Sequence, residues 1–270
     1  MIFDILQYDF IQRALIIGVA LAISAALLSP FLVLNHQAMI ADGLAHVSFT
    51  GLALGILLMN EPLIISVPFV MIASLLIKYL SSKMNGDAAI GLVSAFAFAI
   101  GLIIIKKGAG FNYSIESLIS GNIFTSTTSL MILGVLTTVF ILAFILIFYR
   151  KLFLMTYDFD YAKFKGIHVQ LLGYVLSALT AFFIAIGVRT IGVLLISAFV
   201  IFPSVISSQF TKSFMMTLMT GLITSIAVTI AGIFIAHPLE IPVGSTIVVL
   251  YTFLLVIMII VKRFLRGEST

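Results

Sequence analysis

The sequence predicts an all-α, multi-pass membrane protein, and its composition and its long apolar runs carry this prediction. Of the 270 residues, 62% are hydrophobic and only 9% are charged, and the mean hydropathy is +1.30. Soluble domains carry about 25% charged residues. The apolar runs are continuous rather than alternating, which excludes a transmembrane β-barrel. We therefore expect a bundle of membrane-spanning helices.

Apolar runs long enough to cross a bilayer as helices, which takes about 20 residues, follow one another along the chain. We expect about nine spans. Eight is the alternative, because the run at 190–208 follows Arg189 closely and would then pack as a half-span on its neighbour. No separate soluble domain is evident, so residues 1–270 are expected to form one transmembrane domain. The expected spans are 10–34, 38–59, 62–80, 87–105, 128–149, 168–187, 190–208, 213–236 and 243–262.

Basic residues orient the predicted spans, because cytoplasmic loops carry an excess of Lys and Arg. The excess of basic residues on the inside is largest when the N-terminus is outside and the C-terminus is inside. The net charge of +4 follows from this topology and does not indicate nucleic-acid binding. The inside group is then Lys78, Lys83, Arg150, Lys151, Lys163, Lys165, Lys212, Lys262, Arg263 and Arg266, and the outside group is Arg13, Lys106, Lys107 and Arg189.

Two connections between the spans are too long to be simple turns. The first, 106–127, is expected outside and carries Glu116 in a short amphipathic patch. The second, 150–169, is expected inside, with Asp158 suited to a helix N-terminus and Gly166 to its end. A short amphipathic helix on the inner surface suits a cytoplasmic partner; the alternative is a connector resting on lipid headgroups.

Asp42 and His46 are the most informative polar residues of the chain. Both fall inside the second expected span, where an ionised carboxylate is costly and so indicates a functional site. At a spacing of four they project from one helix face. A carboxylate oxygen and an imidazole nitrogen on one face can bind a divalent transition metal. We therefore predict that Asp42 and His46 are metal ligands.

Four other residues are weaker candidates for an accessory metal path. Asp87 follows Gly86 at the start of a span, where capping that helix is its alternative role. His36 lies between the first two spans as either an interfacial loop residue or an accessory ligand. His237 and Glu240 are expected at the outer mouth, either as a solvated loop or as groups that receive a cation from a delivery protein.

The sequence argues against enzymatic activity. It has no cysteine, which excludes disulfides and thiolate metal ligands. No G-x-x-x-x-G-K-[ST] loop is present, so ATP would have to be hydrolysed by another polypeptide. Asp42 and Asp87 lack the G-x-G-D context of an intramembrane aspartyl protease, and no H-E-x-x-H occurs. A secondary transporter and a non-transport membrane scaffold remain alternatives.

Five segments, in order along the whole chain, resemble the zinc/manganese-type ATP-binding-cassette importer permeases. FLVLNHQAMIADGLAHVSFTGLALG contains the D-x-L-[SA]-H element, and TYDFDYAKFKGIHVQLL resembles the family's coupling segment. Two departures are Asn35 and His36 where the family often carries arginines, and Ser120 in place of a phenylalanine. The segments are 31–55, 117–124, 156–172, 191–207 and 241–250.

This resemblance implies a type II importer permease in the cell membrane that works as a homodimer. A cytoplasmic ATPase subunit would dock on the coupling segment 156–167, and an extracytoplasmic metal-binding lipoprotein would deliver the ion. The coupling residues carried over are Tyr157, Asp158, Ala162 and Gly166, and the metal path contains Asp42 and His46. The resemblance is closest to zinc-uptake members, so the expected cargo is zinc, with manganese or iron as alternatives and no resident cofactor.

Overall fold

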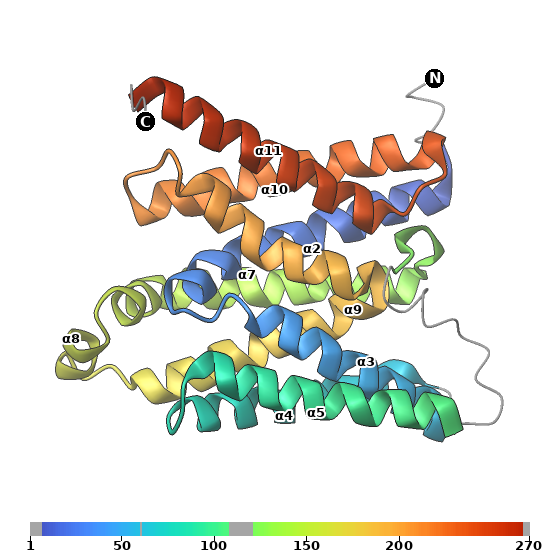
Figure 1. Ribbon diagram of the computed structural model, residues 1–270, viewed down its shortest axis with the longest axis horizontal. Coiled ribbons are helices and arrows are strands. Elements are labelled where there is room, and N and C mark those ends of the chain that lie inside the picture. Colours follow the sequence, from blue (N-terminus) through green and yellow to red (C-terminus); the bar gives the residue numbers. More distant parts are fainter. Residues whose placement is uncertain (1–6, 60, 108–120, 267–270) are drawn as a thin grey trace.

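The computed structural model describes residues 7–59, 61–107 and 121–266, and in this part of the chain every element is helical (Figure 1). Eight of the described helices are long and apolar enough to cross a membrane, which confirms the predicted all-α membrane fold. Glu116 and most of the 106–127 connection lie outside the described residues. The elements are α2 (Asp9–Leu34), α3 (Ile40–Met59), α4 (Pro62–Ser81), α5 (Gly86–Lys107), the 3-10 turn η1 (Ile123–Thr125), α7 (Thr128–Tyr157), α8 (Phe159–Phe164), α9 (Val169–Ser207), α10 (Phe214–Leu239) and α11 (Val243–Arg266).

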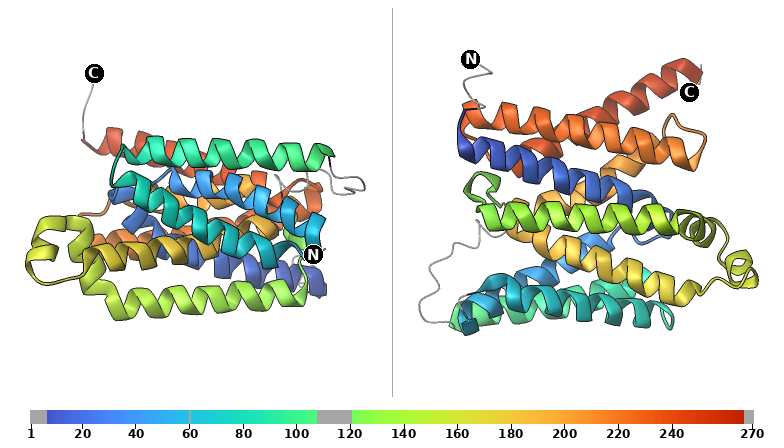
Figure 2. Two further views of the ribbon diagram at one scale, coloured as in Figure 1. Left: turned by 90° about the horizontal axis from the view of Figure 1, so that it is seen from below. Right: turned by 180° about the vertical axis from the view of Figure 1, so that it is seen from behind.

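Helices α2, α3 and α9 form the centre of the bundle. Between 72% and 78% of their most apolar stretches is buried, against 28% to 33% for α4, α5, α7, α10 and α11. Helix α2 packs on α7, α9 and α10, while α3 packs on α4, α5 and α9 (Figures 1 and 2). The outer helices turn exposed Leu, Ile, Val and Phe side chains outward, as lipid contact requires. The predicted metal ligands therefore lie on a central helix.

Small residues let α4 lie directly against α3. A Cβ atom on Gly51 would stand 2.7 Å from Cα of Ser66, and one on Gly55 would stand 2.6 Å from the carbonyl oxygen of Pro62. Only glycine fits at such distances. The hydroxyls of Ser48 and Ser66 then hydrogen-bond across the contact at 3.2 Å. Close backbone approach with interhelical hydroxyl bonds is the usual way in which helices associate in lipid.

Helix α9 contains a reversal of the chain at Gly192, whose φ of 85° and ψ of 166° are not helical. A Cβ atom on Gly187 would clash with Cδ1 of Ile196, although nine residues of straight helix would span about 14 Å. Figure 1 shows the two limbs meeting at the bend. The two limbs of α9, before and after Gly192, therefore correspond to the predicted separate spans 168–187 and 190–208, with a sharp break between them in place of a loop.

The second limb of α9 has about 15 residues and a length of roughly 23 Å, less than the roughly 30 Å of a bilayer core. The second limb is short, as the half-span alternative expects, but it leads the chain back toward α8 (Figure 1). With α9 counted as two limbs, the described helices number nine besides the short α8 and η1, which agrees with the nine expected spans. The start of α2 and the end of α11 lie at opposite ends of the bundle, and α8 lies at the same end as the end of α11 (Figure 1). This is the arrangement that the predicted orientation requires, and we call this end of the bundle the α8 end.

Candidate functional site

Asp42 and His46 lie one turn apart at the start of α3 and face each other. Nε2 of His46 is 3.7 Å from Oδ2 of Asp42, and the two side chains are 34% and 44% exposed, respectively. Their neighbours Ala41, Leu44 and Ala45 are fully buried. The structure therefore confirms that Asp42 and His46 share one face of α3. Both side chains are partly open to solvent, although most of the helix around them is buried.

Two other helices complete the surroundings of the pair. The Ser197 hydroxyl, on the second limb of α9, donates to Oδ1 of Asp42 at 3.4 Å and also to the carbonyl of Val193. The ring of Phe98, on α5, lies 4.8 Å from that of His46. Ser197 is five residues, or roughly 8 Å of helix, past the bend at Gly192. The pair is thus packed between three helices within the bundle.

The donors of this pair can hold a cation but do not complete its coordination. One carboxylate and one imidazole suit divalent zinc, manganese or iron, and the negative charge offsets that of the ion in a medium of low dielectric. A tetrahedral zinc site takes four ligands. Over residues 7–59, 61–107 and 121–266, no group of three or more His, Asp or Glu side chains could hold a metal. Within the described residues, water and hydroxyl or carbonyl oxygens are the donors that remain available to such an ion.

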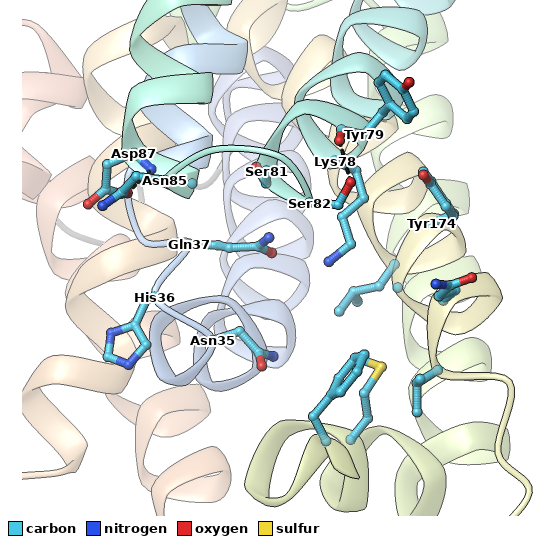
Figure 3. A pocket seen from close by; sticks show the side chains of 17 residues that line it. Asn35, His36, Gln37, Lys78, Tyr79, Ser81, Ser82, Asn85, Asp87 and Tyr174 are labelled. Atoms are coloured by element: carbon cyan, nitrogen blue, oxygen red, sulfur yellow. Dashed lines mark hydrogen bonds between the residues drawn. The ribbon is translucent and has the colours of Figure 1, made fainter. Parts of the chain in front are cut away.

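His36 and Asp87 lie together on a cavity of about 810 Å³ at the α8 end (Figure 3). The cavity is lined largely by polar side chains, among them Asn35, Gln37 and Lys78. Asp42 and His46 are not among its lining residues. The structure thus brings two of the accessory candidates to one cavity, separate from the pair on α3.

The capping role predicted for Asp87 is wrong. The cap of α5 is Asn85, whose Oδ1 accepts a hydrogen bond from the main-chain N–H of Asp87 at 3.0 Å. The helix begins at Gly86, one residue earlier than expected. Asp87 therefore lies in the first turn, where its carboxylate favours the positive end of the helix dipole without bonding the backbone. Its side chain is left free to face the cavity.

His237 and Glu240 lie at the opposite end of the bundle and do not form a pair. The ring of His237 packs at 5.8 Å against both Phe10 and Phe124. Glu240 follows the end of α10 with a left-handed backbone, φ 53°, and its N–H bonds the carbonyls of Ala236 and His237. This geometry gives His237 a packing role and Glu240 a role as helix terminator.

The predicted coupling segment forms the protruding helix α8. Asp158 caps it, since its Oδ1 accepts from the N–H of Tyr161 at 2.9 Å, and Gly166 ends it with φ 76°. Ala162 of α8 is fully buried. Phe164 of α8 and Tyr157 at the end of α7 are more than 80% exposed. A short helix with a fixed base and exposed aromatic side chains is suited to contact with another protein.

Sequence reasoning missed Ser197 and Asn85. A serine in an apolar helix commonly bonds the carbonyl four residues back, as Ser197 does with Val193, so nothing in the sequence distinguishes it as a neighbour of Asp42. Asn85 offered a signal, because an Asn two residues before Asp87 can supply the capping oxygen.

The fold and the site define a class of protein. The structure has eight apolar helices, a partly exposed Asp42–His46 pair on a central helix and a short protruding helix α8. These are features of a multi-pass permease of the cell membrane. The chain belongs to the ABC 3 transport family, which matches residues 7–262.

Relatives and solved structures agree with this membership. The chain is 28% identical over 249 residues to the manganese transport system membrane protein MntC of Halalkalibacterium halodurans, covering 91% of this chain and 85% of the relative. It is 29% identical to the manganese import system permease protein ScaB of Streptococcus parasanguinis, over 90% and 87% of the two chains. Its fold is similar to that in PsaBC from Streptococcus pneumoniae in complex with a Fab, with a TM-score of 0.87, 24% identity and full coverage of both chains.

Proposed function

We propose that this chain, as one permease domain of 270 residues, moves a divalent transition metal into the cytoplasm as part of an ATP-binding-cassette importer. The observation that carries this proposal is the Asp42–His46 pair, 3.7 Å apart on a central helix of a chain that belongs to this transport family. An incomplete set of donors suits a transport site, because the ion must be accepted and then released. The permease itself has no enzymatic activity.

Manganese is the first candidate for the cargo. Relatives named for a metal include manganese systems and one named "probable iron transport system membrane protein", from Haemophilus influenzae, which is 30% identical over 91% of both chains. The expected preference for zinc rested on a resemblance to zinc-uptake members and finds no support in these names. Carboxylate and water suit manganese, while imidazole serves zinc and iron as well.

A second copy of the chain in a homodimer is one source of the missing donors.

Two partners complete the proposed importer. A separate ATPase subunit binds the exposed side chains of Tyr157, the last residue of α7, and Phe164, the last residue of α8. Asp158, Ala162 and Gly166 maintain the shape of α8. A metal-binding lipoprotein docks at the opposite end, near His237 and Glu240. With these partners, cargo would pass from the lipoprotein to Asp42 and His46 and leave through the cavity at the α8 end.

Uptake measurements test the proposed cargo. Membrane vesicles carrying the permease and its ATPase should accumulate labelled manganese when they are loaded with ATP. Unlabelled manganese should reduce this uptake more than the same concentration of zinc does. A secondary transporter would continue uptake without ATP while an ion gradient is held. A scaffold would leave the manganese, zinc and iron content of cells unchanged when the gene is deleted, and this result would contradict the proposal.

A pair of exposed phenylalanines tests the ATPase contact. Phe164 on α8 is 85% exposed and Phe264 near the end of α11 is 83% exposed, so neither substitution disturbs a packed core. Phe164→Ser should sharply reduce co-purification of the ATPase subunit, and Phe264→Ser should not. Ala162→Arg should have at least the effect of Phe164→Ser, because Ala162 is fully buried at the base of α8. Equal retention of the ATPase by both serine variants would show that the contact lies elsewhere.

A further inference from the structure

The inner ends of α2 and α7 are tied together by one side chain. The amide nitrogen of Asn35 donates to the carbonyl of Phe31 at 2.6 Å and to the hydroxyl of Thr156 at 3.2 Å. The first bond closes the end of its own helix. The second joins residues 121 positions apart in sequence, and Thr156 lies two residues before Asp158, the cap of α8. One amide group therefore links the end of α2 to the base of the coupling helix.

An aromatic cluster holds the same two helix ends in contact. The ring of Phe214, the first residue of α10, lies 5.1 Å from both Phe31 of α2 and Phe153 of α7, and 6.2 Å from Tyr149. Phe153 in turn stacks on Tyr157 at 5.9 Å. Such ring pairs add packing energy beyond their buried area. The ends of α2 and α7 are therefore expected to move together.

The connection from Asn35 to Asp42 is short and held by main-chain hydrogen bonds. His36 takes a left-handed backbone with φ 55°. The N–H of Gln37 bonds the carbonyl of Leu32 at 2.9 Å, and that of Ile40 bonds the carbonyl of Gln37 at 3.0 Å. Helix α3 begins at Ile40, and Asp42 lies in its first turn. A displacement of Asn35 is therefore transmitted to the turn that carries Asp42.

We propose that Asn35 and Thr156 form a joint that carries movement of α8 to the Asp42–His46 pair. Movement of the ATPase subunit shifts α8 and the last turn of α7, and the joint passes this shift to the start of α3. The carboxylate of Asp42 and the imidazole of His46 then move toward or away from each other. Asn35 and Thr156 are positioning residues and do not touch the metal. Coupling between distant sites travels through such continuous contacts. This inference rests on the proposed function.

The test compares two substitutions of Thr156 in the assembled permease–ATPase complex. Thr156→Val keeps the shape but removes the hydroxyl, and Thr156→Ser keeps the hydroxyl. Thr156→Val should lower manganese taken up per ATP hydrolysed by about 2- to 30-fold. Manganese binding to the purified permease should stay at the wild-type value, and the ratio is measured on complexes that retain the ATPase subunit. Thr156→Ser should restore most of the ratio.

Thr220→Val is the matched control, because the hydroxyl of Thr220 bonds the carbonyls of Met216 and Thr217 in its own helix. It should leave the ratio unchanged. A wild-type ratio in Thr156→Val would overturn the joint, and so would an equal loss in Thr156→Ser or a loss of the ATPase subunit. If the wild-type complex takes up no metal, the proposed function fails together with the joint. A failure of the joint alone leaves wild-type uptake intact.

Discussion

Two histidine–carboxylate pairs in this chain have similar spacing but different structures. Asp42 and His46 are four residues apart and their side chains meet at 3.7 Å. His237 and Glu240 are three residues apart, yet the imidazole packs on Phe10 and Phe124 and the glutamate is exposed. Residue type and spacing alone therefore do not make a metal site.

The difference comes from where each pair lies relative to its helix. Asp42 and His46 are both inside α3, so the helical repeat places them on one face. Pro238 is in the last turn of α10, and Glu240 lies beyond it in the left-handed conformation, which turns its side chain away from the helical repeat. The first pair therefore shares one helix face, whereas the second marks the end of a helix.

The largest effect is expected from Asp42→Asn, which keeps the shape of the side chain but removes its charge. Uptake of manganese should fall by about 100-fold or more, because even groups that only support metal ligands change affinity by about 10- to 100-fold. Radioactive manganese uptake in cells with matched permease levels measures this. Near-normal uptake would make the Asp42–His46 pair a packing feature like His237.

His46→Ala should also lower uptake, by about 10- to 100-fold. The double variant with Asp42→Asn should be little worse than either single variant, because both residues act on one site. Isothermal titration of manganese into the purified permease gives the three affinities. Additive losses would mean that the two residues do not share an ion.

Ser197→Ala should have a smaller effect, since it removes one hydrogen bond of 3.4 Å to Asp42 and leaves the charge in place. We expect uptake to fall by about 2- to 10-fold, the range for a single hydrogen bond. Ser208→Ala is the control, because the hydroxyl of Ser208 is exposed and bonds only within its helix turn, to Val205. Equal uptake by the two variants would remove Ser197 from the site.

The smallest effects are expected at the other pair. His237→Ala should leave uptake within about 2-fold of wild type. Glu240→Gly should be neutral for uptake and should stabilise the protein by about 1 kcal/mol, because glycine adopts φ 53° without a Cβ clash. Thermal unfolding in detergent measures the shift. A strong loss of uptake in either variant would show that this end handles the ion.

The order of the helices and the shared face of Asp42 and His46 could be predicted because both depend on local properties. Continuous apolar runs of bilayer length define spans, and a spacing of four defines a shared helix face. The capped α8, with Asp158 at its start and Gly166 at its end, follows from the same kind of local signal. A break was expected between residues 187 and 190, but its exact place at Gly192 could not be predicted, because no polar loop separates the two limbs of α9. The cap of α5 was expected at Asp87 but is Asn85, because the sequence does not show at which residue the helix begins.

By itself, the sequence determined that this chain is a multi-pass helical membrane protein with Asp42 and His46 on one helix face. Only the tertiary structure decided that α2, α3 and α9 are central, that Ser197 reaches Asp42, and that Asn35 joins α2 to the base of α8. Helices that are apolar on nearly all sides give no signal for which side faces a neighbour and which faces lipid. Contacts between residues more than 100 positions apart depend on that choice, which is made by packing.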